Sequence, residues 1–94
     1  MRVAETIRSK IEKAFAPVRL VVEDESHKHA GHAGAREGGE THFRVTIVSS
    51  LFEGMSRVER HRSVTAALRE EMGNPIHALA LRTITPAEAS REEG

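Results

Sequence analysis

The clearest pattern in the chain is an alternation of apolar and polar side chains between residues 42 and 49. One face of this segment holds Phe43, Val45 and Ile47. Period-two alternation is typical of a strand with one buried face, so residues 42–49 are predicted to form the central strand. Ser56 and Glu59 then have the spacing of a capping box, in which each side chain accepts a hydrogen bond from the other residue's backbone N–H. A helix is predicted to begin there.

A helix and a first strand precede the central strand. Apolar side chains recur at helical spacing over residues 3–15, and Pro17 disfavours helical geometry at the residue before it. Residues 18–23 alternate with period two, which predicts a strand. Residues 24–41 are rich in glycine, histidine and charge and contain no apolar side chain larger than alanine. We expect a long surface loop, and compact domains rarely keep loops above roughly 12–15 residues unless they are functional or disordered.

The helix after Ser56 is predicted to continue until Gly73, which supplies a left-handed cap, and Pro75 cannot extend it. Its arginines and glutamates, including Arg57 and Arg60, are predicted mostly to face water. Its inner side is predicted to hold Val58, His61, Val64, Thr65, Leu68 and Met72.

The C-terminal part predicts a third strand and a short helix. Residues 76–83 alternate, with His77 at the opening of the strand and two leucines on the same parity. Residues 85–88, T-P-A-E, combine a cap, a proline at the first helical position and a glutamate at the third. A short last helix should follow, and the tail 89–94 is expected to fray.

The predicted order is helix, strand, strand, helix, strand, short helix. The first two strands should pair antiparallel, whereas the second and third are joined by a helical crossover and should lie parallel. The result is an α+β sandwich with helices on one face of a three-stranded mixed sheet, a KH-like type II pattern. KH domains clamp nucleic acid with a GxxG loop, but the corresponding turn here, FEGMS, has only Gly54. The signal for RNA binding of the KH kind is therefore weak.

Composition limits the classes of partner. The 94 residues are expected to form one domain over residues 1–94, and 14 basic side chains cancel 14 acidic ones. No global field draws the chain to nucleic acid or anionic lipid, so such binding needs a local patch. The start of the chain is charged where a signal peptide is apolar, and no segment has the roughly 20 apolar residues of a membrane span. We expect a cytoplasmic protein that does not bind membranes.

Catalytic motifs are missing from the sequence. There is no Ser/His/Asp spacing, phosphate-binding glycine loop or HExxH helix. The carboxylates of Glu23, Asp24 and Glu25 are expected to mark the end of a strand and not to form a catalytic acid/base pair. We predict that the chain is not an enzyme, and we propose no catalytic residue.

Four segments in order resemble the BolA family: DESHKHAGH (24–32), THFRVTIVSSLFEG (41–54), RHR (60–62) and IHALAL (76–81). The resemblance implies the α+β, KH-like fold already inferred. It further implies pairing with a monothiol glutaredoxin of the CGFS type, a shared [2Fe–2S] cluster that glutathione also ligates, and a role in iron–sulfur cluster trafficking and iron homeostasis. Some bacterial members are DNA-binding transcriptional regulators of cell shape and stress response, which is the alternative function.

The absence of cysteine fits a shared cluster. A [2Fe–2S] cluster needs four ligands, usually thiolates, and histidine can replace some of them. A chain with six histidines and no cysteine supplies only part of that set. The thiolates would come from the glutaredoxin and its glutathione. In isolation the chain should hold no cofactor and be a monomer or weak homodimer.

The resemblance assigns His77 as the shared ligand, and the alternative is a partly buried histidine bonded to backbone. It places the second ligand in the loop, where His29 is the first choice, His32 the second and His27 lower. The alternative for these three is a solvated loop, which could also bind zinc or nickel adventitiously. His42 ranks below them as a ligand.

A basic patch follows the central strand. It consists of Arg57, Arg60, His61 and Arg62. A phosphate backbone, bound weakly, or an acidic partner would dock there, and the alternative is a solvated helix face. For His61, a position in the core or at its boundary is the favoured interpretation over a ligand role. Phe52 and Gly54 are predicted to shape the turn, the first as an anchor and the second through a positive φ.

Overall fold

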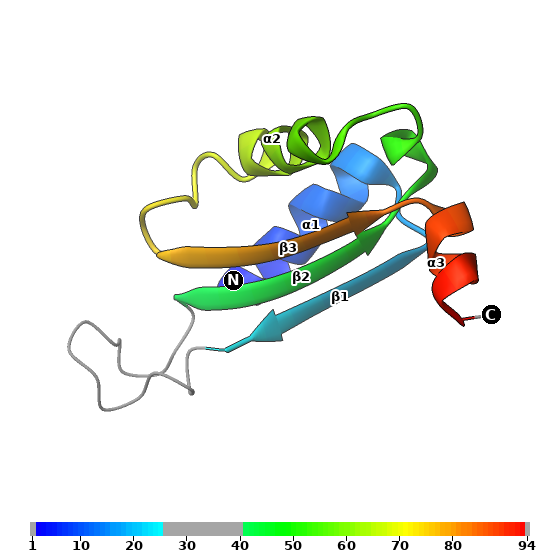
Figure 1. The fold of residues 1–94 in the computed structure, drawn as a ribbon. Helices are drawn as coiled ribbons and strands as arrows, with labels where there is room; N and C mark the ends of the chain where they lie inside the picture. The colour runs from blue at the N-terminus through cyan, green and yellow to red at the C-terminus, as the bar shows by residue number, and fades with distance from the viewer. Residues whose placement is uncertain (1, 26–40, 94) are drawn as a thin grey trace.

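A computed structural model describes residues 2–25 and 41–93, and they form three α-helices and one mixed sheet (Figure 1). The elements are α1 Val3–Phe15, β1 Arg19–Asp24, β2 His42–Val48, the 3-10 turn η2 Ser50–Phe52, α2 Arg57–Ala67, β3 Ala78–Ile84 and α3 Pro86–Glu93. The predicted α+β order is confirmed. Strand ends differ from the predicted ones by one or two residues, which is the usual uncertainty of boundaries.

The sheet has the order β1-β2-β3, with β2 in the middle. β1 pairs with β2 antiparallel, so that Leu20 faces Ile47, and β2 pairs with β3 parallel, so that Phe43 faces Leu79. Both pairings are as predicted. Parallel pairing places the first residues of β2 and β3 at the same end of the sheet, and this determines which side chains can meet there.

The hydrophobic core lies between one face of the sheet and the helices α1 and α2. Its central members are Ile7, Ile11, Phe15, Phe43, Val45, Ile47, Phe52, Val64, Leu68 and Ile76. Each such side chain contributes roughly 1.5–3 kcal/mol when it is fully buried. Val18, predicted to be the first residue of the first strand, lies before β1 and is 72% exposed.

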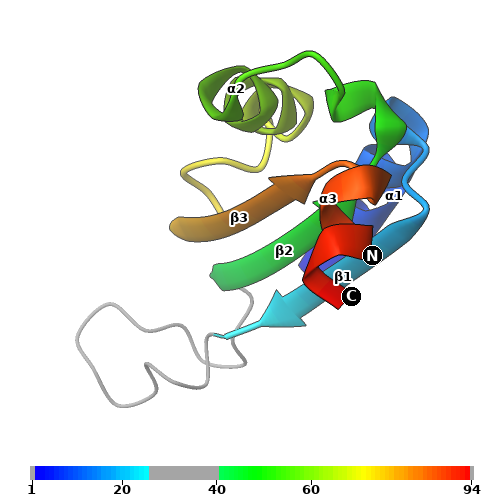
Figure 2. The same cartoon turned by 45° about the vertical axis from the view of Figure 1, so that its right-hand side comes forward.

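The last helix differs from the prediction in position and length. Figure 2 shows α3 in front of the sheet and α1 behind it. Ala89 and Glu92 of α3 line a pocket with Val21 and Val48, which point away from the core. The helices therefore do not all cover one face. The tail expected to fray is helical through Glu93, and an ion pair between Arg82 and Glu92 ties it to β3.

The helix α2 is shorter than its sequence predicts, and a different face of it packs against the core. It ends at Ala67, because the chain then makes successive turns that return Ile76 to the core, with the Ile76 N–H donating to Glu71 O at 3.0 Å. Lys10 of α1 holds this segment through an ion pair with Glu71 at 2.7 Å. The prediction that Val58 faces inward is wrong, since its side chain is 57% exposed.

The turn between β2 and α2 is anchored by Phe52. Its ring is fully buried and packs against the Phe15 ring with the centroids 5.2 Å apart. Ser49 Oγ donates to Phe15 O at 2.7 Å, which fastens the start of the turn to the end of α1. Gly54 has a φ of 80°, the positive value for which the sequence predicts glycine.

None of the helices in the described ranges combines the length and apolar content needed to cross a membrane.

We expect Phe52→Ala to lower the free energy of unfolding by about 3–5 kcal/mol, because it leaves a cavity between α1, the turn and α2. Chemical denaturation measures this loss. Leu51→Ala is the matched control, since the neighbouring Leu51 side chain is 56% exposed, and its effect should stay within about 0.5 kcal/mol. Equal losses in the two variants would contradict the anchoring role of Phe52.

Candidate functional site

His77 lies immediately before β3 with its backbone tied to the sheet. Its N–H donates to Thr41 O at 2.8 Å, and the N–H of Ala78 donates to the same carbonyl at 3.2 Å. Thr41 is only 1% exposed, so this anchor is rigid, whereas His77 itself is exposed. The strand begins two residues later than predicted. Among the described residues, neither ring nitrogen of His77 has a hydrogen-bond partner, so both remain available.

His42 lies beside His77. The two ring centroids are 6.5 Å apart, with the rings at 74° to one another. A hydrogen bond of 2.8 Å joins His42 Nδ1 to Thr41 Oγ1, which orients the His42 ring. The sequence interpretation ranked His42 low and did not pair it with His77. The predicted parallel pairing could have found it, because that pairing puts the first residue of β2 next to the start of β3.

The loop histidines His27, His29 and His32 lie outside the described residues. The two ends of their segment are nevertheless placed. The Glu25 N–H donates to His42 O at 2.7 Å, and the segment ends at Thr41, whose carbonyl holds the backbone of His77. The segment therefore begins and ends beside the His42 and His77 pair.

The described residues can supply only a partial ligand set. His42 and His77 are two imidazoles, cysteine is missing from the whole chain, and the described ranges contain no group of three or more residues suited to hold a metal. A [2Fe–2S] cluster needs four ligands. The site fits such a cluster only if other groups complete the set.

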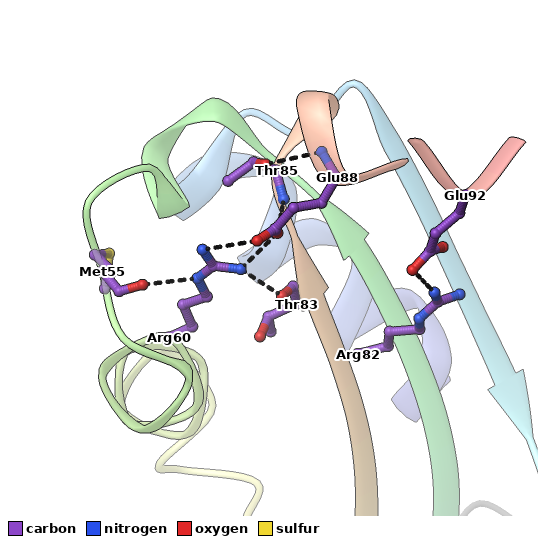
Figure 3. Close-up of polar contacts among 7 residues, drawn as sticks. All are labelled: Met55, Arg60, Arg82, Thr83, Thr85, Glu88 and Glu92. Atoms are coloured by element: carbon purple, nitrogen blue, oxygen red, sulfur yellow. Dashed lines mark hydrogen bonds and ion pairs between the residues drawn. The ribbon is translucent and has the colours of Figure 1, made fainter. Parts of the chain in front are cut away.

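Arg60, predicted to face water in the basic patch, is instead engaged in the interior (Figure 3). Its side chain is 12% exposed, and its guanidinium donates to Met55 O at 3.1 Å, to Thr83 O at 3.0 Å and to Glu88 Oε1 at 2.7 Å. The hydrogen bond from Arg60, helped by the backbone N–H of Thr85, lowers the pKa of Glu88 to about 2. Arg60 therefore connects α2, the turn before it, β3 and α3.

The other predicted patch residues point in different directions. Arg57 and His61 line a cavity of 290 Å³ with Leu81 and Thr83 of β3. Arg62 is exposed and does not line this cavity. Arg57 therefore lies beside both Arg60 and His61, whereas Arg62 lines neither of the cavities that these residues share, so the four residues do not form one continuous patch.

Comparison with known proteins agrees with this fold. The family described as BolA-like protein matches residues 11–88. The chain belongs to the BolA family. Its BolA fold superposes on the solved structure of BolA1 from Arabidopsis thaliana with a TM-score of 0.81 and 52% sequence identity, over 90% of this chain and 93% of that one.

Two curated BolA proteins illustrate the range of relatives. The chloroplastic protein BOLA1 of Arabidopsis thaliana is 49% identical over 96% of this chain, which spans 58% of that protein's length. A Haemophilus influenzae protein named DNA-binding transcriptional regulator BolA is 41% identical over 94% of this chain and 82% of its own length. The BolA similarity thus extends to both plant and bacterial proteins.

The Glu88 pKa gives a pH-dependent prediction. A carboxyl pKa lowered from 4.5 to about 2 stabilises the fold fully above pH 4.5 and loses that contribution as the pH falls toward 2. Glu88→Gln should therefore be less stable than the original chain at pH 6, and the difference should shrink through this window. Urea unfolding at several pH values measures it. Glu53→Gln, in the exposed turn, should stay within about 0.5 kcal/mol of the original throughout. A difference for Glu88→Gln that is constant with pH would contradict the assignment.

Proposed function

We propose that this BolA protein is an adaptor that pairs with a CGFS-type monothiol glutaredoxin and shares a glutathione-ligated [2Fe–2S] cluster with it. His77 is the ligand from this chain. The role would be in iron–sulfur cluster trafficking and iron homeostasis, as the BolA resemblance implies. The observation that supports this most is the His77 imidazole, which is exposed while its backbone is held by the buried Thr41.

Preorganisation favours His77 over a loop residue. Ordering one residue costs roughly 1 kcal/mol or more, and a group whose backbone is already fixed avoids most of that cost on binding. His77 is fixed through two hydrogen bonds from the start of β3 to Thr41 O. Its free ring nitrogens can then meet an incoming metal with little loss of entropy.

The remaining ligands come from the loop and the partner. We propose His29 first, His32 second and His27 third as the second histidine, because their segment begins and ends beside His77. The glutaredoxin cysteine and glutathione supply the thiolates that a chain without cysteine cannot. As an adaptor the protein needs no catalytic residue of its own and holds no cluster when alone.

DNA binding is the second candidate. Arg57 and Arg62 are exposed on α2, and the Haemophilus influenzae relative is named a DNA-binding regulator. The Arg60 guanidinium already donates to Glu88 and Thr83, so only two of the three arginines of the predicted patch are left to contact phosphate. With no net charge, the remaining two arginines give weak, salt-sensitive binding.

The adaptor function predicts a coloured 1:1 heterodimer. Mixing the chain with a CGFS-type glutaredoxin, glutathione, iron and sulfide should give a visible spectrum distinct from that of the glutaredoxin homodimer. His77→Ala should abolish or strongly shift this spectrum. His29→Ala should be milder because a neighbouring histidine can substitute, and replacing all three loop histidines should make the cluster labile while the cluster-free complex persists.

His61→Ala is the matched control for this experiment. It removes one imidazole near the other end of β3, close to Thr83, and should leave the spectrum unchanged. Only the homodimer spectrum from the mixture would overturn the proposed function. An unchanged spectrum and cluster lifetime in His77→Ala would overturn the ligand assignment alone.

DNA binding predicts a shallow salt dependence. Two phosphate contacts from Arg57 and Arg62 give a log–log slope of affinity against salt of about −2. Fluorescence anisotropy with a labelled duplex measures the slope. Arg57→Gln with Arg62→Gln should bring it close to zero. Tight, sequence-selective binding at physiological salt would instead favour the regulator over the adaptor.

A further inference from the structure

The outer edge of β3 is an open side of the sheet. β3 pairs with β2 along one edge only. The Ser49 N–H donates to Ile84 O at 3.0 Å on the β2 side, whereas Thr83 O receives Arg60 on the opposite side. The N–H and C=O of one strand residue point to the same edge, and successive residues alternate between the two edges. The backbone N–H and C=O of Leu79 and Leu81 therefore point outward, as Thr83 O does. These four groups are available for pairing with a further strand.

This edge lacks the usual protection against pairing. Edge strands are commonly blunted by charges, proline or bulges. β3, ALALRTI, has one charged residue, keeps an unbroken register with β2 and contains no proline. The other edge strand, β1, is RLVVED, with three charged residues in six. The chain therefore protects β1 and leaves β3 open.

A positively charged groove runs beside the C-terminal half of this edge. Arg57 and His61 of α2 form one wall of the 290 Å³ cavity, residues 81–84 of β3 form the other, and Glu92 of α3 also lines it. The nearby carboxylates of Glu88 and Glu92 are already engaged by Arg60 and Arg82. In the described part of the chain Arg57 has no such partner. The groove thus offers an unpaired cation beside unpaired backbone groups.

We propose that an extended acidic segment of a partner protein pairs with the outer edge of β3 as a fourth strand, with a carboxylate reaching Arg57. Backbone pairing of this kind gives affinity, and side chains of one parity give specificity. The backbone groups of Leu79 and Leu81 follow His77 by two and four residues, whereas Arg57 lies beside the last residues of β3. The proposal uses this backbone edge and Arg57, and it requires neither the His77 imidazole nor the glutaredoxin partnership.

The chemistry of the groove favours a peptide over the other occupants. Single-stranded nucleic acid binds by stacking bases on exposed aromatic rings. This chain has no tryptophan or tyrosine, and its three phenylalanines, Phe15, Phe43 and Phe52, are at most 7% exposed. A second copy paired through β3 would offer Arg57 no carboxylate from the strand, because β3 is ALALRTI.

A synthetic peptide tests the proposal. The probe alternates valine and glutamate over about eight residues, a length that covers a typical strand. Titration to millimolar concentration, followed by amide NMR, should shift the Leu79 and Leu81 N–H signals and slow their hydrogen exchange. The N–H of Ala80 is the internal control, since it already points toward β2. A valine–lysine peptide should bind at least several-fold more weakly.

Reversing the charge of Arg57 tests whether the peptide binds beside this residue. Arg57→Glu should weaken binding of the acidic peptide by about three- to tenfold, and Arg62→Glu, on another side of α2, should leave it unchanged. No change at Leu79 and Leu81, or equal effects of the two reversals, would overturn the proposal. Stronger binding of oligothymidylate than of the peptide at the same amides would also overturn it. A dimer seen by sedimentation, with the Leu79 and Leu81 amides protected in the absence of peptide, would do so too.

Discussion

The Arg60 guanidinium is the interaction on which the arrangement around β3 depends. It donates to the turn at Met55, to the outer carbonyl of Thr83 and to Glu88 of α3, and it lies over the Phe52 ring at 5.9 Å from the centroid. The network is partly buried, with the Arg60 side chain 12% and the Glu88 side chain 33% exposed, so removing Arg60 leaves acceptors that water satisfies only in part. The network therefore sets how α2 and α3 meet β3.

That arrangement has consequences for the neighbouring residues of α2. Because Arg60 points inward, Arg57, three residues before it, and His61, the next residue, face the groove along β3. Val58 is turned to solvent by the same rotation. The Thr83 carbonyl already accepts a hydrogen bond from Arg60, so it cannot pair with a further strand. A partner strand can therefore pair with Leu79 and Leu81 but not with Thr83.

Much of the fold could be predicted from the sequence because its periodic signals are local. The alternation of Phe43, Val45 and Ile47 and the capping box of Ser56 and Glu59 are both found in the structure. The face of α2 could not be predicted, since burial of Arg60 depends on Glu88, which lies on another helix. His42 was missed for a similar reason: its closeness to His77 follows from strand register, and side-chain spacing along the chain does not show it.

The two candidate surfaces lie along the same strand. β3 rises by about 3.3 Å per residue, so the seven residues from Ala78 to Ile84 separate its ends by roughly 20 Å. His77 is held at the first end by Thr41, and the groove beside Arg57 lies toward the second. His77 and Arg57 thus lie near opposite ends of β3, with the outward backbone groups of Leu79 and Leu81 between them. The register of β3 against β2 fixes these separations, so the proposed ligand and the proposed pairing edge belong to one continuous stretch of chain.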